Sequence, residues 1–529
     1  MDCLKYVLGW SLVACTTTSQ SPAPLEAERI LSSTPDPIER AKSLSKREYQ
    51  ESFAEGFGAR EQLLFRGYFA FLNRDHDSAL TALDAYLMGA KYNQDRRYEL
   101  SALKAIIETH RALIMQPEHR SAYVASLKSY VNVYSSAKPL DLAEAEALMD
   151  VKLKLARVYA TDGDLGNAEA INKAVAEFRT FDSPALKLAR FDAGVRLARE
   201  IAAGRKHFAQ AAEMLKKLES EAPTEAQLLS LRFYQGFYLY LTETPVKAVA
   251  LFNTHRKFFE ASRDYKFRAS YWKALALLKI RSKTAGENLL TEIVQKAPYS
   301  YYGQLAVMRL RKNVSVAPHR DEAPAPIPVT EFQRAQDLNT QKRFVETFAL
   351  LTQLSPADDQ IPGSPLLSLY YPQPFLEEFK RAALEHKLET ETLLGLARQE
   401  SAFQEKVVTF DFGYGIMQIQ AEKAALIANK TGDFRSEKLL EAAYNIDLGA
   451  AILRESLDHF HGKTYLAAAA YNAGIPSVES WLKRRHRNSI EEFIEDIPFE
   501  GTGKHVRNVL KNRANYSLLY RGSLPSEYF

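Results

Sequence analysis

The sequence has 529 residues, which is too long for a single hydrophobic core, because single cores stop growing at roughly 250–300 residues. We therefore expect at least two folding units. The net charge of +4 is mild and does not indicate a nucleic-acid binder, and the densest basic run, "KRRHR" at 483–487, is interpreted as a solvated helix end or loop. Both cysteines, Cys3 and Cys15, lie near the N-terminus, which excludes a disulfide framework, a thiolate metal site or a catalytic cysteine from the main body.

The N-terminal stretch "MDCLKYVLGWSLVAC" carries Lys5, a short apolar run and then "LVA" directly before Cys15. It resembles a bacterial lipoprotein signal peptide, which is cut before a cysteine that receives a lipid. The resemblance implies a signal peptide at 1–14, a flexible tether at 15–37 and a membrane anchor at Cys15. Thr16 favours sorting to the outer membrane, facing the periplasm. The alternative is an ordinary N-terminal segment, because the basic region is weak.

Residues 38–312 show the apolar spacing of helices, with isolated prolines between helical stretches and no convincing strand alternation. Several segments, such as "LARVYATDGDLGNAEAI" at 155–171, look like one helix, a turn and a second helix. One such pair cannot bury its apolar face alone, so the pattern favours an α-superhelix, or solenoid, of stacked helix pairs. The alternative is an ordinary helical bundle.

A change of composition follows. Residues 313–375 contain the proline-rich run "APHRDEAPAPIP", which favours extended chain, and a short helical segment near 330–354. We predict that they form a linker. Residues 376–529 return to helices with polar loops and are long enough to form a domain of their own. The expected fold class is therefore mainly all-α.

The stretch "ETETLLGLARQESAF" at 389–403 predicts a helix with Leu393, Leu396 and Phe403 on its buried face. Glu400 lies three and four residues after apolar positions, so it falls over the same face. A carboxyl group held against apolar groups has a raised pKa, which suits a general acid near neutral pH. Taken alone, an exposed glutamate at a helix end is the commoner explanation.

Two further stretches carry polar groups next to small residues. In "GYGIMQI" at 413–419, two glycines allow the backbone to approach a ligand closely, and Gln418 is the polar residue of an apolar run. A buried amide needs partners, and a sugar hydroxyl or N-acetyl group would serve. The run "LAAAAYNAG" at 466–474 predicts a closely packed helix that ends at Gly474 and presents Tyr471 and Asn472 to a cleft.

These stretches in this order resemble the catalytic domain of the soluble lytic transglycosylases, which has a lysozyme-like fold. "YYPQPF" at 370–375, "YNIDLGAAIL" at 444–453 and "IPF" at 497–499 match weaker parts of the same pattern. Upstream, "YWKALALL" at 271–278 and "PYSYYGQLAVMRL" at 298–310 look like the end of the α-superhelical domain of those enzymes. The resemblance supports a superhelix followed by a lysozyme-like domain.

The resemblance also implies roles for individual residues. Glu400 matches the single catalytic acid and base. The matching substrate-binding positions are Ser401, Thr409, Tyr414, Met417, Gln418, Tyr471 and Asn472. The expected substrate is peptidoglycan, with envelope proteins as further partners of the superhelix, and neither a cofactor, a metal nor nucleic acid is expected.

The sequence departs from the family pattern at three places. Tyr414 stands where a small residue is usual, in a loop closer to that of goose-type lysozymes. Ala421 replaces a proline. Gly501 and Gly503 replace the glutamate and arginine that usually flank Thr502 after "IPF", so the acidic and the basic group of that pair are missing here.

Glycosidases normally use two carboxylates, whereas the resemblance implies that Glu400 alone first protonates the leaving oxygen and then deprotonates the 6-hydroxyl of the muramic acid, closing a 1,6-anhydro ring. Two alternatives stay open. Asp411 could act with Glu400 in an inverting muramidase, although a loop-capping role for Asp411 is commoner. The chain could also be a non-catalytic helical scaffold that binds peptidoglycan.

Overall fold

A computed structural model describes residues 34–44, 49–88, 96–113, 117–135, 142–161, 184–203, 207–310, 329–354, 367–409, 413–428, 436–485 and 487–529. The chain divides into two compact units, one within residues 13–200 and a second that contains 201–220 and 224–529. The division falls inside the stretch predicted as one superhelical domain, because the helices after residue 201 pack with the C-terminal helices. The domain boundaries drawn from the sequence stay a prediction.

Several predictions concern residues outside the described ranges. They are the signal peptide at 1–14, the lipid-bearing Cys15, the proline-rich run that begins the linker, and Asp411. Among the described residues, no helix combines the length and the apolar character needed to cross a bilayer.

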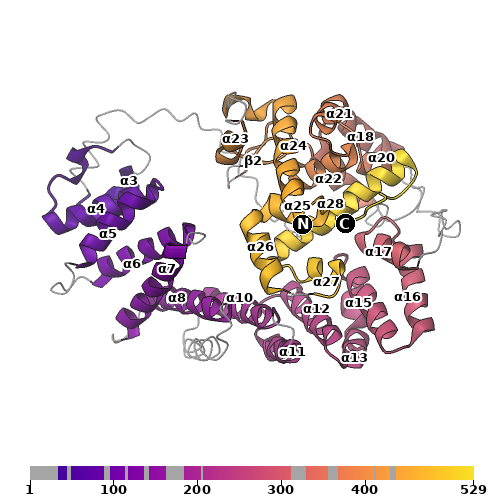
Figure 1. The fold of residues 1–529 in the computed structure, drawn as a ribbon, viewed down its shortest axis with the longest axis horizontal. Coiled ribbons are helices and arrows are strands. Elements are labelled where there is room, and N and C mark those ends of the chain that lie inside the picture. Colours follow the sequence, from indigo (N-terminus) through magenta and orange to yellow (C-terminus); the bar gives the residue numbers. More distant parts are fainter. Residues whose placement is uncertain are drawn as a thin grey trace. The chain divides into compact units, whose positions relative to one another are not determined.

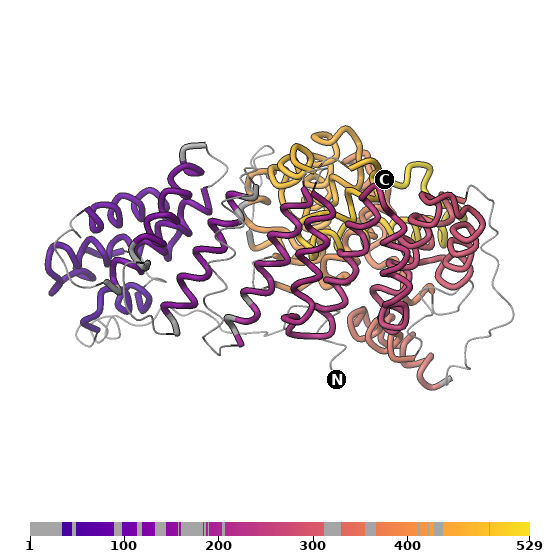
Figure 2. Tube along the Cα trace, turned by 90° about the horizontal axis from the view of Figure 1, so that it is seen from below, coloured from indigo at the N-terminus to yellow at the C-terminus, as the bar shows by residue number. Residues whose placement is uncertain are grey.

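The first unit is a row of helices, and from residue 37 to residue 161 each packs on the next one described, as the indigo and purple tubes of Figure 2 show. Its interior is aliphatic and aromatic, with Leu64, Leu83 and Tyr86 fully buried in one cluster and Tyr130 in the next. The elements are α3 (Pro37–Leu44), a 3-10 turn (Glu51–Ala54), α4 (Ala59–Leu72), α5 (His76–Met88), α6 (Arg96–Ala112), α7 (Pro117–Ser135), α8 (Leu142–Thr161) and α10 (Pro184–Ile201).

The second unit begins with another row of sequentially packed helices, which we call the platform. Its elements are α11 (Phe208–Lys217), a 3-10 turn (Glu219–Glu221), α12 (Glu225–Leu241), α13 (Val246–Thr254), α14 (Arg256–Glu260), α15 (Lys266–Lys279), α16 (Lys283–Lys296) and α17 (Tyr301–Leu310). Aromatic rings fill the space between them; Phe237 and Trp272, for example, meet edge to face with ring centres 4.7 Å apart. The sequential stacking in both units confirms the prediction of a mainly α fold built from helix pairs.

The rest of the second unit carries the predicted site. Its elements are α18 (Val329–Thr340), α19 (Phe344–Leu354), α20 (Leu367–Tyr370), α21 (Leu376–Glu385), α22 (Thr390–Ser401), β1 (Gly413–Tyr414), β2 (Ile419–Gln420), α23 (Ala421–Ala428), a 3-10 turn (Ser436–Leu440), α24 (Ala442–His459), α25 (Thr464–Ala473), α26 (Ile475–Arg484), α27 (Ile490–Glu495) and α28 (Glu500–Arg521). The two strands pair in antiparallel fashion, with Gly413 opposite Gln420 and Tyr414 opposite Ile419.

The long helix α28 is the central element of this unit, and both α22 and α25 pack on it (Figure 1). Gly395 makes the contact with α22 close, because a Cβ atom at this position would stand 2.8 Å from the backbone nitrogen of Arg513. The side-chain amide of Asn512 donates to the Gly395 carbonyl across the same contact, at 3.2 Å. A small residue in the middle of α22 therefore fixes how near the predicted catalytic helix lies to α28.

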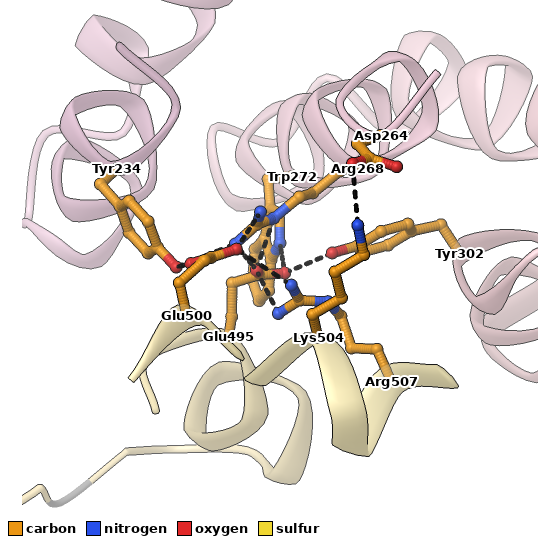
Figure 3. Close-up of polar contacts among 9 residues, drawn as sticks. All are labelled: Tyr234, Asp264, Arg268, Trp272, Tyr302, Glu495, Glu500, Lys504 and Arg507. Atoms are coloured by element: carbon orange, nitrogen blue, oxygen red, sulfur yellow. Dashed lines mark hydrogen bonds and ion pairs between the residues drawn. The ribbon is translucent and has the colours of Figure 1, made fainter. Parts of the chain in front are cut away.

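A buried charge network joins the start of α28 to the platform (Figure 3). Glu495, 2% exposed, accepts hydrogen bonds from Arg268 at 2.7 Å, from the Trp272 indole at 2.6 Å and from the Tyr302 hydroxyl at 2.7 Å. Glu500 pairs with Arg268 at 2.9 Å and with Arg507 at 3.2 Å. Burial alone would lower the pKa of Arg268, but the two carboxylates raise it well above its ordinary value.

The basic run at 483–487 is solvated only in part: Lys483 is exposed, as predicted, but two of the arginines are not. The side chains of Arg485 and Arg487 are each 1% exposed, and both pair with the fully buried carboxylate of Asp496. Arg487 also donates to the Ala202 carbonyl at 2.7 Å. The solvated interpretation was wrong because the carboxylate that neutralises these cations lies beyond the run, where charge patterning along a helix does not reveal it.

The network predicts that Glu495→Gln lowers the free energy of unfolding by about 3–5 kcal/mol, since it leaves buried guanidinium groups without a full counter-charge. Chemical denaturation followed by circular dichroism measures the change. The matched control is Glu292→Gln, whose partner Lys296 lies 2.8 Å away in an exposed pair and whose loss costs less than about 1 kcal/mol. Equal and small losses in both variants would contradict the prediction.

Candidate active site

Glu400 lies in the last turn of α22, and its side chain is 14% exposed. The apolar residues before it, Leu393 and Leu396, are completely buried, as their spacing predicts. The helix ends in two consecutive residues with left-handed backbone, Ala402 at φ 52° and Phe403 at φ 63°. This conformation is costly for residues other than glycine, and it persists here because the Phe403 ring is held between Phe344 and Phe379. The reversal turns the chain toward the next loop directly after Glu400.

The loop of β1 and β2 is held to α24 by one side chain, Asn445, which is 1% exposed. Its amide oxygen accepts from the Met417 N–H at 2.7 Å, and its amide nitrogen donates to the carbonyls of Tyr414 and Leu439, both at 2.8 Å. Gly415, at φ 67°, lets Asn445 come this close, since a Cβ atom there would stand 2.8 Å from the amide nitrogen. The glycine predicted to allow close approach to a ligand thus allows close approach to a protein side chain.

Gln418 and Thr409 bind each other within this loop. The Thr409 hydroxyl donates to the Gln418 amide oxygen at 2.9 Å, and the Gln418 amide nitrogen donates to the Gly415 carbonyl at 2.8 Å. Gln418 also has left-handed backbone, at φ 50°. The amide that the sequence singled out is therefore partnered inside the protein and held in a fixed orientation.

Ser401 and Met417 are both buried. The Ser401 hydroxyl donates to the Ile416 carbonyl at 2.7 Å, which ties the end of α22 to the loop. Met417 has no exposed surface and packs against Gly449 of α24. Direct contact of Met417 with a ligand would need a change in the loop, so its predicted binding role is better described as support of Gln418.

The two polar residues at the end of α25 face different partners. The Tyr471 hydroxyl donates to the Met417 carbonyl at 2.8 Å. Burial, together with the negative charge of Glu400, raises the pKa of Tyr471 well above its ordinary value, which brings this phenol and Glu400 into one electrostatic environment. Asn472 accepts from the Thr502 hydroxyl at 2.7 Å and so contacts the first turn of α28.

Two residues near Glu400 were not predicted from the sequence. His505 of α28 is buried, and its Nε2 lies 3.8 Å from Oε1 of Glu400. Lys423 of α23 lies with its ammonium group 5.3 Å from the centre of the Tyr471 ring. Burial lowers the pKa of Lys423, while Glu455 and Glu400 oppose that shift. Neither residue belongs to a recognisable motif, and only the fold brings them to Glu400.

Comparisons with known proteins agree with this geometry. Residues 377–494 match the family model described as the transglycosylase SLT domain. The soluble lytic murein transglycosylase of Escherichia coli K12 is 31% identical over 160 residues, which cover 30% of this chain and 25% of that protein. The protein of the same name from Salmonella typhimurium LT2 is 33% identical over 150 residues, 28% of this chain and 23% of that protein.

Residues 377–494 belong to the transglycosylase SLT family. The matched part of the chain covers about a quarter of the length of each of these curated relatives. Among solved structures, an inactive mutant of the lytic transglycosylase Slt from Pseudomonas aeruginosa matches with a TM-score of 0.56 at 18% identity, over 96% of this chain and 90% of that one. That similarity shows the fold, a superhelix with a lysozyme-like domain.

Gly501 and Gly503 stand where a glutamate and an arginine were expected. An acid and a base, Glu500 and Arg507, nevertheless lie close to these glycines. Arg507 reaches back so that its Nη1 lies 3.3 Å from where a Cβ of residue 503 would stand. There it binds Glu500, and both belong to the network that joins α28 to the platform. The charged pair near this turn therefore faces the platform.

The contacts of Asn445 predict that Asn445→Ala removes three hydrogen bonds, two of them buried, and leaves their backbone partners unsatisfied, which costs at least about 2 kcal/mol of unfolding free energy. The loop that carries Gln418 also loses these hydrogen bonds to α24. Urea denaturation measures the loss of stability. Asn253→Ala, at an exposed position of α13, is the control and leaves the stability unchanged; an Asn445→Ala variant as stable as the wild-type protein would contradict the assignment.

Proposed function

We propose that the protein is a peptidoglycan lytic transglycosylase that cleaves the β-1,4 bond between N-acetylmuramic acid and N-acetylglucosamine. The observation that carries the proposal is the position of Glu400: one largely buried carboxylate at the end of α22, beside the loop of Gln418, within a stretch that belongs to the SLT family. The names of the curated relatives, which act on murein, support the same substrate class.

In the proposed reaction, protonated Glu400 gives its proton to the glycosidic oxygen as the bond to C1 of the muramic acid breaks. The neighbouring N-acetyl group shares the positive charge that develops at C1. Glu400, now a carboxylate, takes the proton from the 6-hydroxyl of the same sugar, and that oxygen bonds to C1. The products are a new GlcNAc end and a 1,6-anhydro ring, no water is consumed, and Glu400 returns to its starting form.

The surrounding residues would position the glycan rather than exchange protons. Gln418, held by Thr409, presents a fixed amide edge, and Tyr471 and Asn472 hold the end of α25 beside it. Fixed geometry of this kind makes a large contribution to rate, because the reacting atoms need not be ordered at each turnover. Ser401 and Met417 support the loop, and Tyr414, half-buried at the strand pair, is proposed as a residue that shapes the sugar subsite.

The proposal predicts that the full-length protein releases 1,6-anhydro muropeptides from purified sacculi and that Glu400→Gln does not. One general acid and base contributes roughly 10²–10⁴-fold, so the variant should lose at least about 100-fold. Mass spectrometry of the soluble products measures both. Glu479→Gln, whose carboxylate pairs with His459 on the surface, is the control and keeps full activity.

The same assay distinguishes the alternatives. Products with reducing ends would show that the protein hydrolyses the bond, as a muramidase does. Asp411 would then be the second carboxylate to test. If the wild-type protein released no soluble product, the remaining function would be that of a non-catalytic scaffold that binds peptidoglycan.

We further propose that the protein works in the cell envelope, where its substrate lies, and that Cys15 carries a lipid that anchors it to the outer membrane. The motif before Cys15 supports this. Expression of the full chain in a Gram-negative host should give a membrane-bound form that incorporates labelled palmitate, whereas Cys15→Ala should not be labelled. Equal labelling of the two forms, or of neither, would refute the anchor.

A further inference from the structure

His505 is a buried histidine that the proposed reaction does not use. It lies in the second turn of α28 and is 4% exposed. Among the described residues, its Nε2 atom has no hydrogen-bond partner. The nearest carboxylate oxygen is Oε1 of Glu400, at 3.8 Å. A buried polar atom without a partner is costly, so its direction toward the predicted catalytic carboxyl calls for an explanation.

We propose that His505 is a positioning residue that donates an Nε2–H hydrogen bond to Oε1 of Glu400 when substrate is bound. An approach of about 1 Å would bring the two atoms to the ordinary distance of about 2.9 Å, and hydrogen bonds in catalytic sites are often long in the free enzyme and shorten in the complex. This inference rests on the proposed function, because it assigns His505 a part in the acid–base work of Glu400.

The donor has a specific effect on where the proton of Glu400 resides. An oxygen that accepts a hydrogen bond from an N–H serves as the carbonyl oxygen of a protonated carboxyl group, so the proton is left on the other oxygen. If Oε1 faces His505, the acidic proton stands on Oε2, where it can be given to the glycosidic oxygen. After that transfer, the same N–H stabilises the carboxylate until it takes the next proton.

A neutral donor suits this task better than a cation. Burial lowers the pKa of His505 to about 4, so the imidazole is uncharged at neutral pH. A full positive charge at this distance would hold Glu400 as a carboxylate and oppose its first role as an acid. Lys423 of α23 and Tyr471 of α25 also interact electrostatically with Glu400, and Glu455 of α24 interacts with Lys423 in turn.

The position of His505 is fixed from both sides. Arg507, two residues further on, and Glu500, five residues before, belong to the network with the platform, and Thr502 binds Asn472. The first two turns of α28 are therefore held at three points around His505. A histidine on such a turn can hold a carboxyl group in place with little loss of side-chain entropy.

The experiment compares His505→Phe, which keeps a ring but removes the donor, with His505→Gln, whose amide N–H reaches about as far as Nε2. On sacculi we expect kcat of the Phe variant to fall roughly 10- to 100-fold with KM little changed, because the lost hydrogen bond is to a group that becomes charged. Loss of a donor to the carboxylate raises the pKa of Glu400, so the alkaline limb of its pH–kcat profile moves to higher pH. The Gln variant should restore both kcat, to within a few-fold, and the position of the limb.

His459→Phe is the matched control, since His459 lies 2.9 Å from Glu479 in an exposed pair away from the site, and it should leave the profile unchanged. If His505→Phe does not fold, as judged by thermal unfolding, His505→Asn replaces it, because its shorter amide cannot reach Oε1. An unchanged profile in the Phe or Asn variant, or equal losses in these and in His505→Gln, would overturn the role of His505 while wild-type activity still upheld the transglycosylase. An inactive wild-type protein would overturn the proposed function and this inference with it.

Discussion

The close contact between α22 and α28 is the constraint on which the site depends. Gly395 allows it, because any side chain there would meet the backbone of Arg513. The two helices pass each other in opposite directions, so that residue 395 meets 513 while Glu400, one and a half turns further along α22, meets His505 nearer the start of α28. Asn512 strengthens the contact by binding both the Gly395 carbonyl and the Arg398 guanidinium. A single small residue therefore sets the distance at which the carboxyl of Glu400 faces α28.

The same helix carries the buried charges that hold it to the platform. Buried ion pairs are weak sources of net stability, because removing charges from water costs about as much as their attraction returns. Their value here is geometric: Glu495 accepts hydrogen bonds from three platform residues at once, namely Arg268, Trp272 and Tyr302. The platform thus fixes the start of α28, and α28 in turn fixes what faces Glu400. Two parts of the chain that are about 230 residues apart in sequence share one rigid connection.

The sequence was sufficient to predict the parts of the site that lie on one element. Glu400 and its apolar face follow from helical spacing, and the helix end at Gly474 follows from the glycine itself. Contacts between elements could not be predicted in this way. His505 stands in "KHVRNVL", a stretch that is ordinary for a helix, and Asn445 stands in a helix whose pattern shows only which face is buried. Arg485 and Arg487 were misinterpreted for the same reason, since their partner Asp496 lies beyond the run, directly after α27.

The charges around Glu400 suit the proposed reaction, in which one group acts first as an acid and then as a base. Such a group works best when neither form is strongly preferred, because it has to give up a proton and regain one in each turnover. Glu400 is largely buried at the end of α22, and the cation of Lys423 interacts electrostatically with it. The neutral His505 can bind either form through the same oxygen, and so adds orientation without adding charge. In the proposed reaction, these surroundings would let one carboxyl group do the work that most glycosidases divide between two.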